Sequence, residues 1–127
     1  QKRQKRALTI REMAIFAMLG AMAAGDIGKL FPDSDEALAG ADSLVLCRAV
    51  AQKLSENGYK IVNVDSTVIA QSPKLAPFIE QMRENISNAL GICVDDISVK
   101  ATTEEGLGFS GEKLGIAAHA VCLIESV

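Results

Sequence analysis

Two kinds of apolar periodicity alternate along this chain, and their order limits the folds that it can adopt. Three stretches have apolar residues at three- and four-residue spacing or are rich in Ala, Leu and Met, as is typical of helices: Glu12–Ala24, Asp42–Glu56 and Phe78–Leu90. Three others are rich in β-branched or alternating apolar residues, as is typical of strands: Ile61–Gln71, Ile97–Ala101 and Ile116–Ile124. This interleaving predicts an α+β or α/β fold with two layers, in which helices cover a small mixed sheet.

Turn-forming residues separate these elements. We expect Gly25 to cap the first helix at its C-terminus and Asp42 or Ser43 to cap the second at its N-terminus. Residues 26–35 are predicted to form a loop, because they are rich in Gly, Pro and Asp. The last strand is nearly all apolar, which predicts burial on both of its faces. We expect its His119 to lie in the core or at a subunit interface rather than to bind a metal ion.

The composition is that of one domain with an ordinary core. The 127 residues are 49% hydrophobic and 23% charged, so the chain can fold without disulfides. Aromatic residues make up only 4% and Trp is absent, which argues against a surface for stacking nucleic-acid bases. The three cysteines are far apart and form no CxxC. They argue against a disulfide scaffold or a cysteine zinc site and indicate a reducing, cytoplasmic location.

The charge is uneven along the chain. The first eleven residues hold five basic and no acidic side chains, whereas residues 12–127 hold 8 basic and 16 acidic ones. We therefore divide the chain into a divergent basic arm, residues 1–11, and a domain, residues 12–127. The arm has two interpretations, a solvated tail or a contact for nucleic acid or another polyanion. The apolar run Met13–Leu19 imitates a signal peptide, but Glu12 adjoins it and it is too short to span a bilayer.

Three polar segments are candidates for a binding site. Two of them, Ala70–Pro77 and Thr102–Glu105, follow predicted strands, and ligands of sheet folds collect at strand ends. The third is the Asp-rich loop Asp26–Asp35. Backbone N–H groups at Gly or Pro turns and Thr hydroxyls suit phosphate oxygens, and a carboxylate such as Glu105 beside phosphates suits Mg²⁺. Taken singly, each segment could equally be a solvated loop or strand end.

Taken together, these segments resemble a known family. The motifs are Gly25-Asp26-Ile27-Gly28, Phe31-Pro32-Asp33-Ser34-Asp35, Asn63–Lys74, Val99–Glu105 and Leu107–Gly111. In order and spacing they closely resemble the 2-C-methyl-D-erythritol 2,4-cyclodiphosphate synthases of the non-mevalonate (MEP) pathway to isoprenoid precursors. The resemblance spans about Met18 to Val127, most of the chain.

The resemblance implies a homotrimer whose active sites lie between neighbouring subunits. It implies a phosphorus–oxygen lyase that converts 4-CDP-2-C-methyl-D-erythritol 2-phosphate to the cyclic diphosphate and CMP. The partners expected from it are this CDP-linked small molecule and further copies of the chain, with no nucleic acid and no membrane.

The resemblance also assigns residues to the substrate. One subunit would contact the methylerythritol phosphate end through Asp26, Ile27, Gly28, Phe31, Pro32, Asp33, Ser34 and Asp35. Its neighbour would hold cytidine and the diphosphate through Ala70, Gln71, Ser72, Pro73, Lys74, Leu75, Ala76, Thr102, Thr103, Glu104, Glu105 and Phe109. Thr103 and Lys74 would act in catalysis, with Thr103 stabilising the transition state, and Glu105 would bind Mg²⁺. Such roles suit phosphoryl transfer, in which positioning and charge neutralisation supply most of the catalysis.

The N-terminal residues depart from the family pattern. The family binds Zn²⁺ (or Mn²⁺) through an Asp-x-His near the N-terminus and a histidine on the first helix. Glu12 stands where that histidine belongs, Gln4–Leu8 keep none of the family's residues, and we interpret the chain as starting after the Asp-x-His strand. The family's zinc ligands are therefore missing from this sequence. A milder departure is Glu112, which follows Phe109-Ser110-Gly111 where the family often has an arginine.

Three functional hypotheses follow from the sequence. The leading one is a cyclodiphosphate synthase. Its alternative is a catalytically impaired trimer that binds cytidine nucleotides but has lost the transition-metal site. The third is polyanion binding through the basic arm, which would depend strongly on salt concentration.

Overall fold

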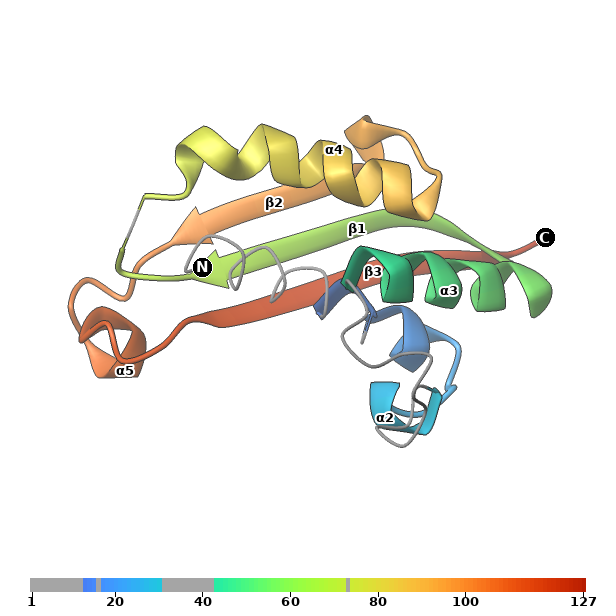
Figure 1. Ribbon diagram of the computed structural model, residues 1–127, viewed down its shortest axis with the longest axis horizontal. Helices are drawn as coiled ribbons and strands as arrows, with labels where there is room; N and C mark the ends of the chain where they lie inside the picture. Colours follow the sequence, from blue (N-terminus) through green and yellow to red (C-terminus); the bar gives the residue numbers. More distant parts are fainter. Residues whose placement is uncertain (1–12, 16, 31–42, 73) are drawn as a thin grey trace.

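The computed structural model describes residues 13–15, 17–30, 43–72 and 74–127 (Figure 1). Residues 13–15 and 17–21 are helical. The elements that follow, in chain order, are α2 (Ile27–Leu30), α3 (Ser43–Glu56), β1 (Tyr59–Ile69), the 3₁₀ turn η2 (Ala76–Phe78), α4 (Ile79–Leu90), the 3₁₀ turn η3 (Val94–Asp96), β2 (Ile97–Thr102), α5 (Gly108–Gly111) and β3 (Ala117–Ser126). The predicted helices and strands are present, with ends that differ by a few residues from those expected.

The three strands form one mixed sheet with the order β2-β1-β3. β1 runs parallel to β2, with Val64 opposite Ile97 and Ile69 opposite Thr102. β3 runs antiparallel to β1 and places Ala117 opposite Ile69. A parallel pair needs a crossover connection, and α4 supplies it between β1 and β2 (Figure 1). The prediction of two layers with a small mixed sheet is confirmed.

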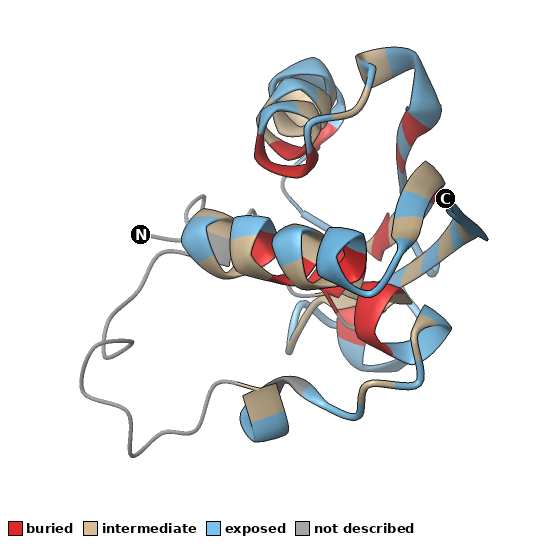
Figure 2. Ribbon diagram, turned by 90° about the vertical axis from the view of Figure 1, so that its right-hand side faces the viewer, coloured by how far each residue is buried: buried red, intermediate tan, exposed pale blue. Residues whose placement is uncertain are grey.

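One face of the sheet carries the core. Val64, Ser66 and Val68, which alternate along β1, are buried, and α3 contacts β1 while α4 contacts β2. Figure 2 shows the buried residues gathered where the helices meet the sheet. The apolar spacing that predicted the helices therefore marks their inner faces. The largest fully buried side chains come from every layer of this core: Ile15, Met18, Leu19, Leu54, Ile86, Ile97, Val50, Val64, Val68 and Cys47.

None of the described residues covers the other face of the sheet. The exposed apolar side chains of this open face belong to β3. Val121 is 70% exposed and Leu123 is 56% exposed. The prediction that this strand is buried on both faces is wrong, because only the face that carries Cys122 and Ile124 packs against the core. His119 is exposed on the open face, so a position in the core is wrong for it as well. An interface position for His119 stays a prediction.

The open face is polar towards β2. Lys100 Nζ lies 2.9 Å from Asp65 Oδ2. This hydrogen bond, opposed by a little desolvation, holds the pKa of the Asp65 carboxyl below its ordinary value. A polar side and an apolar side thus share one surface of the sheet.

The first helix ends earlier than predicted. The N–H of Ala24 bonds to Leu19 O at 2.9 Å and that of Ala23 bonds to Gly20 O at 3.0 Å, which is the Schellman arrangement. Ala23 takes the left-handed conformation, with φ 54°. The prediction that Gly25 caps this helix is therefore wrong. Ala24 packs against the core, and that contact outweighs the local preference for glycine at a left-handed position.

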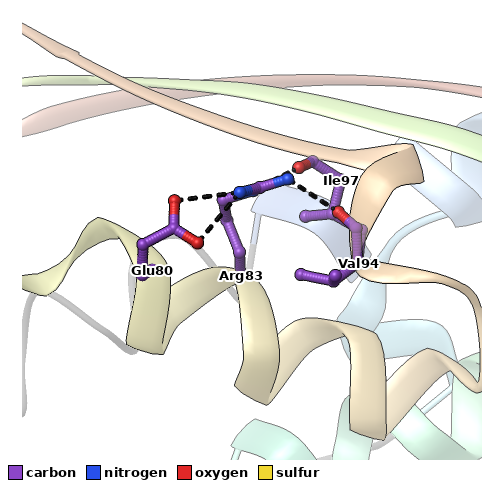
Figure 3. Close-up of polar contacts among 4 residues, drawn as sticks. All are labelled: Glu80, Arg83, Val94 and Ile97. Atoms are coloured by element: carbon purple, nitrogen blue, oxygen red, sulfur yellow. Dashed lines mark hydrogen bonds and ion pairs between the residues drawn. The ribbon is translucent and has the colours of Figure 1, made fainter.

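Arg83 ties α4 to the start of β2 (Figure 3). Its Nε donates to Ile97 O at 2.7 Å and its Nη2 donates to Val94 O at 2.9 Å. Its Nη1 meets both carboxylate oxygens of Glu80, at 2.9 and 3.0 Å. The planar fork of the guanidinium can serve all of these acceptors at once. One side chain therefore fixes where β2 begins relative to α4.

Replacing Arg83 by Met should lower the free energy of unfolding by about 2–3 kcal/mol, because the carbonyls of Val94 and Ile97 lose charged donors. Urea denaturation followed by circular dichroism measures this change. Glu80→Gln is the matched control, since the Glu80 side chain is 73% exposed and its loss should cost less than about 1 kcal/mol. Equal costs for the two variants would assign the stabilisation to the ion pair instead of to the carbonyl contacts.

Candidate functional site

The parallel pairing brings two of the predicted site segments together. β1 and β2 end side by side, with Ile69 opposite Thr102, so the residues that follow start from one edge of the sheet. A hydrogen bond of 3.0 Å from Ala70 N–H to Thr102 O extends the pairing past the end of β1. The two segments line a cavity of about 200 Å³, whose walls are Ala70, Gln71, Lys74, Leu75, Ala76, Ala101, Thr102 and Thr103.

The cavity combines apolar and polar walls. Ala70 and Leu75 are buried, at 7% and 6% exposure. Lys74, Thr102 and Thr103 are exposed and offer an ammonium group and two hydroxyls. A flat ring can pack on the apolar walls while these polar groups bind an anion. Small-molecule sites commonly combine apolar walls with a few polar groups in this way.

A tight turn follows Thr103. Glu105 and Gly106 both have left-handed backbones, with φ 53° and 83°, and Leu107 N–H bonds to Glu104 O at 3.0 Å. Two successive positive φ angles are typical of the turns in two-residue hairpins. The Oγ1 of Thr103 accepts the N–H of Glu105 at 3.3 Å. A hydroxyl that accepts one hydrogen bond keeps its own proton to donate, so Thr103 can serve an oxygen acceptor in the cavity.

The short helix α5 supports this turn through a contact between two glycines. A Cβ on Gly111 would lie 2.2 Å from the carbonyl carbon of Gly106 and 2.8 Å from its Cα and O. The two backbones therefore approach more closely than a side chain allows. Sequence reasoning found a glycine-rich region here but missed that these two glycines meet. Phe109, also on α5, is 55% exposed and is not one of the cavity walls.

Residues 26–30, the described part of the Asp-rich segment, are not among the cavity walls within one chain. Asp26 Oδ1 accepts the N–H of Lys29 at 2.9 Å, which is a helix cap and starts α2. The prediction of a loop is therefore wrong for Ile27–Leu30, which form α2. Figure 1 places α2 away from the end of the sheet at which β1 and β2 stop.

The remaining predicted site residues fall into two groups. Ser72, Glu104 and Glu105 are exposed and adjoin the cavity walls in sequence. The others lie outside the described residues: Phe31, Pro32, Asp33, Ser34, Asp35 and Pro73.

The capacity to bind a metal ion depends on the donor set. The part of the chain that the structure describes holds no group of three or more His, Cys, Asp or Glu side chains placed to bind a metal ion, so a Zn²⁺ site does not fit these residues. Glu105 would fit Mg²⁺ in another way, because its side chain is exposed two residues after Thr103 and Mg²⁺ commonly takes one or two carboxylates together with substrate phosphates.

Two further observations concern the described residues outside the cavity. Over the ranges given above, no helix is both long and apolar enough to cross a membrane. The three cysteines, all within those ranges, are present as thiols, and burial raises the pKa of the Cys122 thiol.

The fold and the cavity define a class of protein: a two-layer α/β domain whose site, at the ends of parallel strands, offers hydroxyl, carboxamide and ammonium groups suited to a phosphorylated ligand. The model of the YgbB family matches residues 13–125, and the chain belongs to this family.

Curated relatives carry one name. The 2-C-methyl-D-erythritol 2,4-cyclodiphosphate synthase of Clostridioides difficile is 58% identical over 108 residues, which cover 85% of this chain and 67% of the relative. The synthase of Thioalkalivibrio sulfidiphilus is 59% identical over 110 residues, which cover 87% of this chain and 69% of the relative. The family resemblance found in the sequence is confirmed.

Solved structures share the fold. The bifunctional IspDF of Campylobacter jejuni matches with a TM-score of 0.88 and 39% identity, covering 94% of this chain and 32% of that one. The IspF of Plasmodium falciparum, solved as a CDP complex, matches with a TM-score of 0.82 and 36% identity, covering 93% of this chain and 70% of that one.

Gly111→Ala should lower the free energy of unfolding by about 1–3 kcal/mol, because its Cβ meets backbone that cannot rotate away. Thermal or urea unfolding measures the loss. The control is Gly20→Ala, whose Cβ would meet nothing within 4 Å and which lies in a helix. That variant should gain up to about 1 kcal/mol. A Gly111→Ala variant as stable as the wild type would mean that Gly106 and Gly111 are not in contact in solution.

Proposed function

We propose that this chain cyclises 4-CDP-2-C-methyl-D-erythritol 2-phosphate to the cyclic diphosphate and releases CMP. The observation that carries this proposal is the cavity at the ends of β1 and β2, whose walls include Lys74, Thr102 and Thr103. Further support comes from relatives of 58–59% identity named as synthases of this cyclic diphosphate and from the CDP complex that shares the fold. The protein would then be a phosphorus–oxygen lyase of isoprenoid precursor biosynthesis.

The reaction is an internal phosphoryl transfer. An oxygen of the 2-phosphate attacks the β-phosphorus, the bond from that phosphorus to the oxygen shared with the α-phosphorus breaks, and CMP leaves with this oxygen and the bonding pair. The protein's task is to hold the attacking and leaving oxygens in line and to neutralise negative charge.

The described cavity suits the nucleotide half of the substrate. The cytosine ring would pack on the apolar walls formed by Ala70, Leu75 and Ala76. The exposed backbone and hydroxyls of Thr102 and Thr103 would bind phosphate oxygens, since short hydroxyls and backbone N–H groups are good donors to phosphate. Gln71 and Ser72 would complete this side of the site.

Lys74 and Thr103, which both line the cavity, would stabilise negative charge on the diphosphate. The Lys74 ammonium would neutralise diphosphate oxygens, and Thr103 would donate its hydroxyl proton to an oxygen that gains charge in the transition state. Glu105, with Glu104 beside it, would hold Mg²⁺, and the bound ion would supply further positive charge to the diphosphate. The Zn²⁺ (or Mn²⁺) expected for the family has no matching ligands in the described residues, and no step is assigned to it.

The methylerythritol end would be held by a second subunit. Within one chain α2 lies away from the cavity, so Asp26, Ile27 and Gly28, with Phe31–Asp35, would reach the substrate from a neighbour in a homotrimer. The open face of the sheet, with Val121 and Leu123 exposed on β3, offers a surface for that association. Residues 12–127 would form the catalytic domain and residues 1–11 a basic arm, in a cytoplasmic protein whose cysteines are thiols.

Lys74→Ala should weaken CDP binding about tenfold or more, because a charge-assisted contact to phosphate is lost. Calorimetric titration with Mg²⁺ present measures the affinity, and phosphorus NMR of the full substrate measures CMP release. Lys53→Ala is the matched control, since Lys53 lies on α3 away from the ends of β1 and β2 (Figure 1).

The same two measurements separate the hypotheses. Turnover by the wild-type chain supports the lyase. CDP binding without turnover, with zinc and magnesium supplied, would select the impaired nucleotide-binding protein instead. Binding of neither CDP nor substrate by a folded chain would overturn the proposed function.

Association through the open sheet face can be tested with Val121→Glu. We expect the wild-type chain to sediment as a trimer and the variant as a monomer, because a buried carboxylate without a partner is strongly unfavourable. Val45→Glu is the control, since Val45 is 49% exposed on α3. A wild-type monomer, or a trimer that tolerates Glu at position 121, would contradict this interface.

A further inference from the structure

Among the described residues, two hydrogen bonds join the segment that follows β1 to β2 and the turn after it. One is the backbone bond from Ala70 N–H to Thr102 O, which belongs to the sheet pairing. The other is made by a side chain: Gln71 Oε1 accepts the N–H of Gly106 at 3.1 Å. Because a backbone N–H can only donate, the oxygen of the carboxamide must face Gly106. Gln71 also lines the cavity. Its contact with Gly106 therefore links the wall formed after β1 to the turn that follows Thr103.

The turn that receives this contact has an unfavourable backbone of its own. Glu105 is a non-glycine residue at φ 53° and is followed by Gly106 at φ 83°. An L-residue in the left-handed region is disfavoured, so the turn depends on contacts from its surroundings. Gly111 contacts it from the side of α5, Thr103 Oγ1 accepts the N–H of Glu105, and Gln71 holds it from the side of β1.

We propose that Gln71 is a positioning residue that holds the turn at Glu105 and Gly106 and thereby places the Thr103 hydroxyl and the Glu105 carboxylate beside the cavity. The expected effect on ligand binding rests on the proposed function, because it assumes that the Thr103 hydroxyl and the Glu105 carboxylate act on the diphosphate. The contact is exposed, so its effect on global stability is small and its main effect is on this turn.

The test uses two variants of Gln71 and one control. Gln71→Met keeps the length of the side chain but has no oxygen to accept the Gly106 N–H. Gln71→Glu keeps an acceptor. Gln81→Met is the matched control, because Gln81 lies on α4 and pairs with Asn85. Unfolding midpoints of all three should stay close to the wild-type value.

Two measurements on these proteins read out the contact and its consequence. Amide hydrogen exchange followed by NMR should show Gly106 exchanging about three- to tenfold faster in Gln71→Met, but at close to the wild-type rate in Gln71→Glu and Gln81→Met. Titration with Mg²⁺ present should show CDP bound about three- to tenfold more weakly by Gln71→Met. The affinity for CMP, which lacks the β-phosphate, should fall less than about twofold, because the turn acts on the diphosphate.

The outcomes are distinguishable from failure of the proposed function. Unchanged exchange at Gly106 in Gln71→Met would overturn the contact itself. Faster exchange with equal losses for CDP and CMP, or with no loss for CDP, would overturn the positioning role. A wild-type chain that binds neither nucleotide would overturn both the proposed function and the consequence for ligands, while the exchange rate at Gly106 would still decide whether Gln71 holds the turn.

Discussion

The parallel pairing of β1 with β2 is the constraint on which the candidate site depends. Parallel neighbours end at the same edge of a sheet, so Ala70–Ala76 and Thr102–Glu105 begin side by side although α4 separates them in sequence. The register is as important as the direction. A slip of one residue would exchange the faces of neighbouring side chains along β2 and carry the threonines away from the cavity. Arg83 opposes such a slip, because it bonds to the carbonyl of Ile97, the first residue of β2, and to that of Val94 in the preceding turn η3.

Beyond the strand ends, the shape of the site is set by small groups and main-chain atoms. A bare Cα at Gly111 lets α5 touch the backbone of Gly106, and a hydroxyl and a carboxamide bind the two amides of the turn. Each contact is weak when taken alone, but all of them act on Glu105 or Gly106. A turn held from several sides can keep a left-handed Glu105 in place, and such local strain is common where geometry serves a ligand.

Much of the fold was predictable because it follows from periodicity. The spacing of apolar residues gave the helices over residues 43–56 and 79–90, and the alternation from Ile97 to Ala101 gave β2. The site segments were predictable because strand ends collect polar residues and because their motifs resemble one family. Long-range contacts were not predictable, since no local pattern says that Gly111 meets Gly106 or that Arg83 reaches Val94. The end of the first helix and the exposure of β3 were mispredicted because packing and strand order decided them, and neither is encoded locally.

Under the proposed function, the one-sided sheet would link folding to the completeness of the site. Helices cover one face of β1, β2 and β3. On the other face, the described residues leave Val121 and Leu123 in solvent. Burying such apolar surface would stabilise the protein by about 25 cal/mol per Å². Association through that face would recover this energy. Because α2 lies away from the cavity of its own chain, the proposed second subunit would also bring Asp26–Gly28 to the cavity walls. Burial of the β3 side chains and assembly of a site from two subunits would then occur together. A chain that folds without associating would keep its cavity but would lack Asp26–Gly28 of a neighbouring chain beside it.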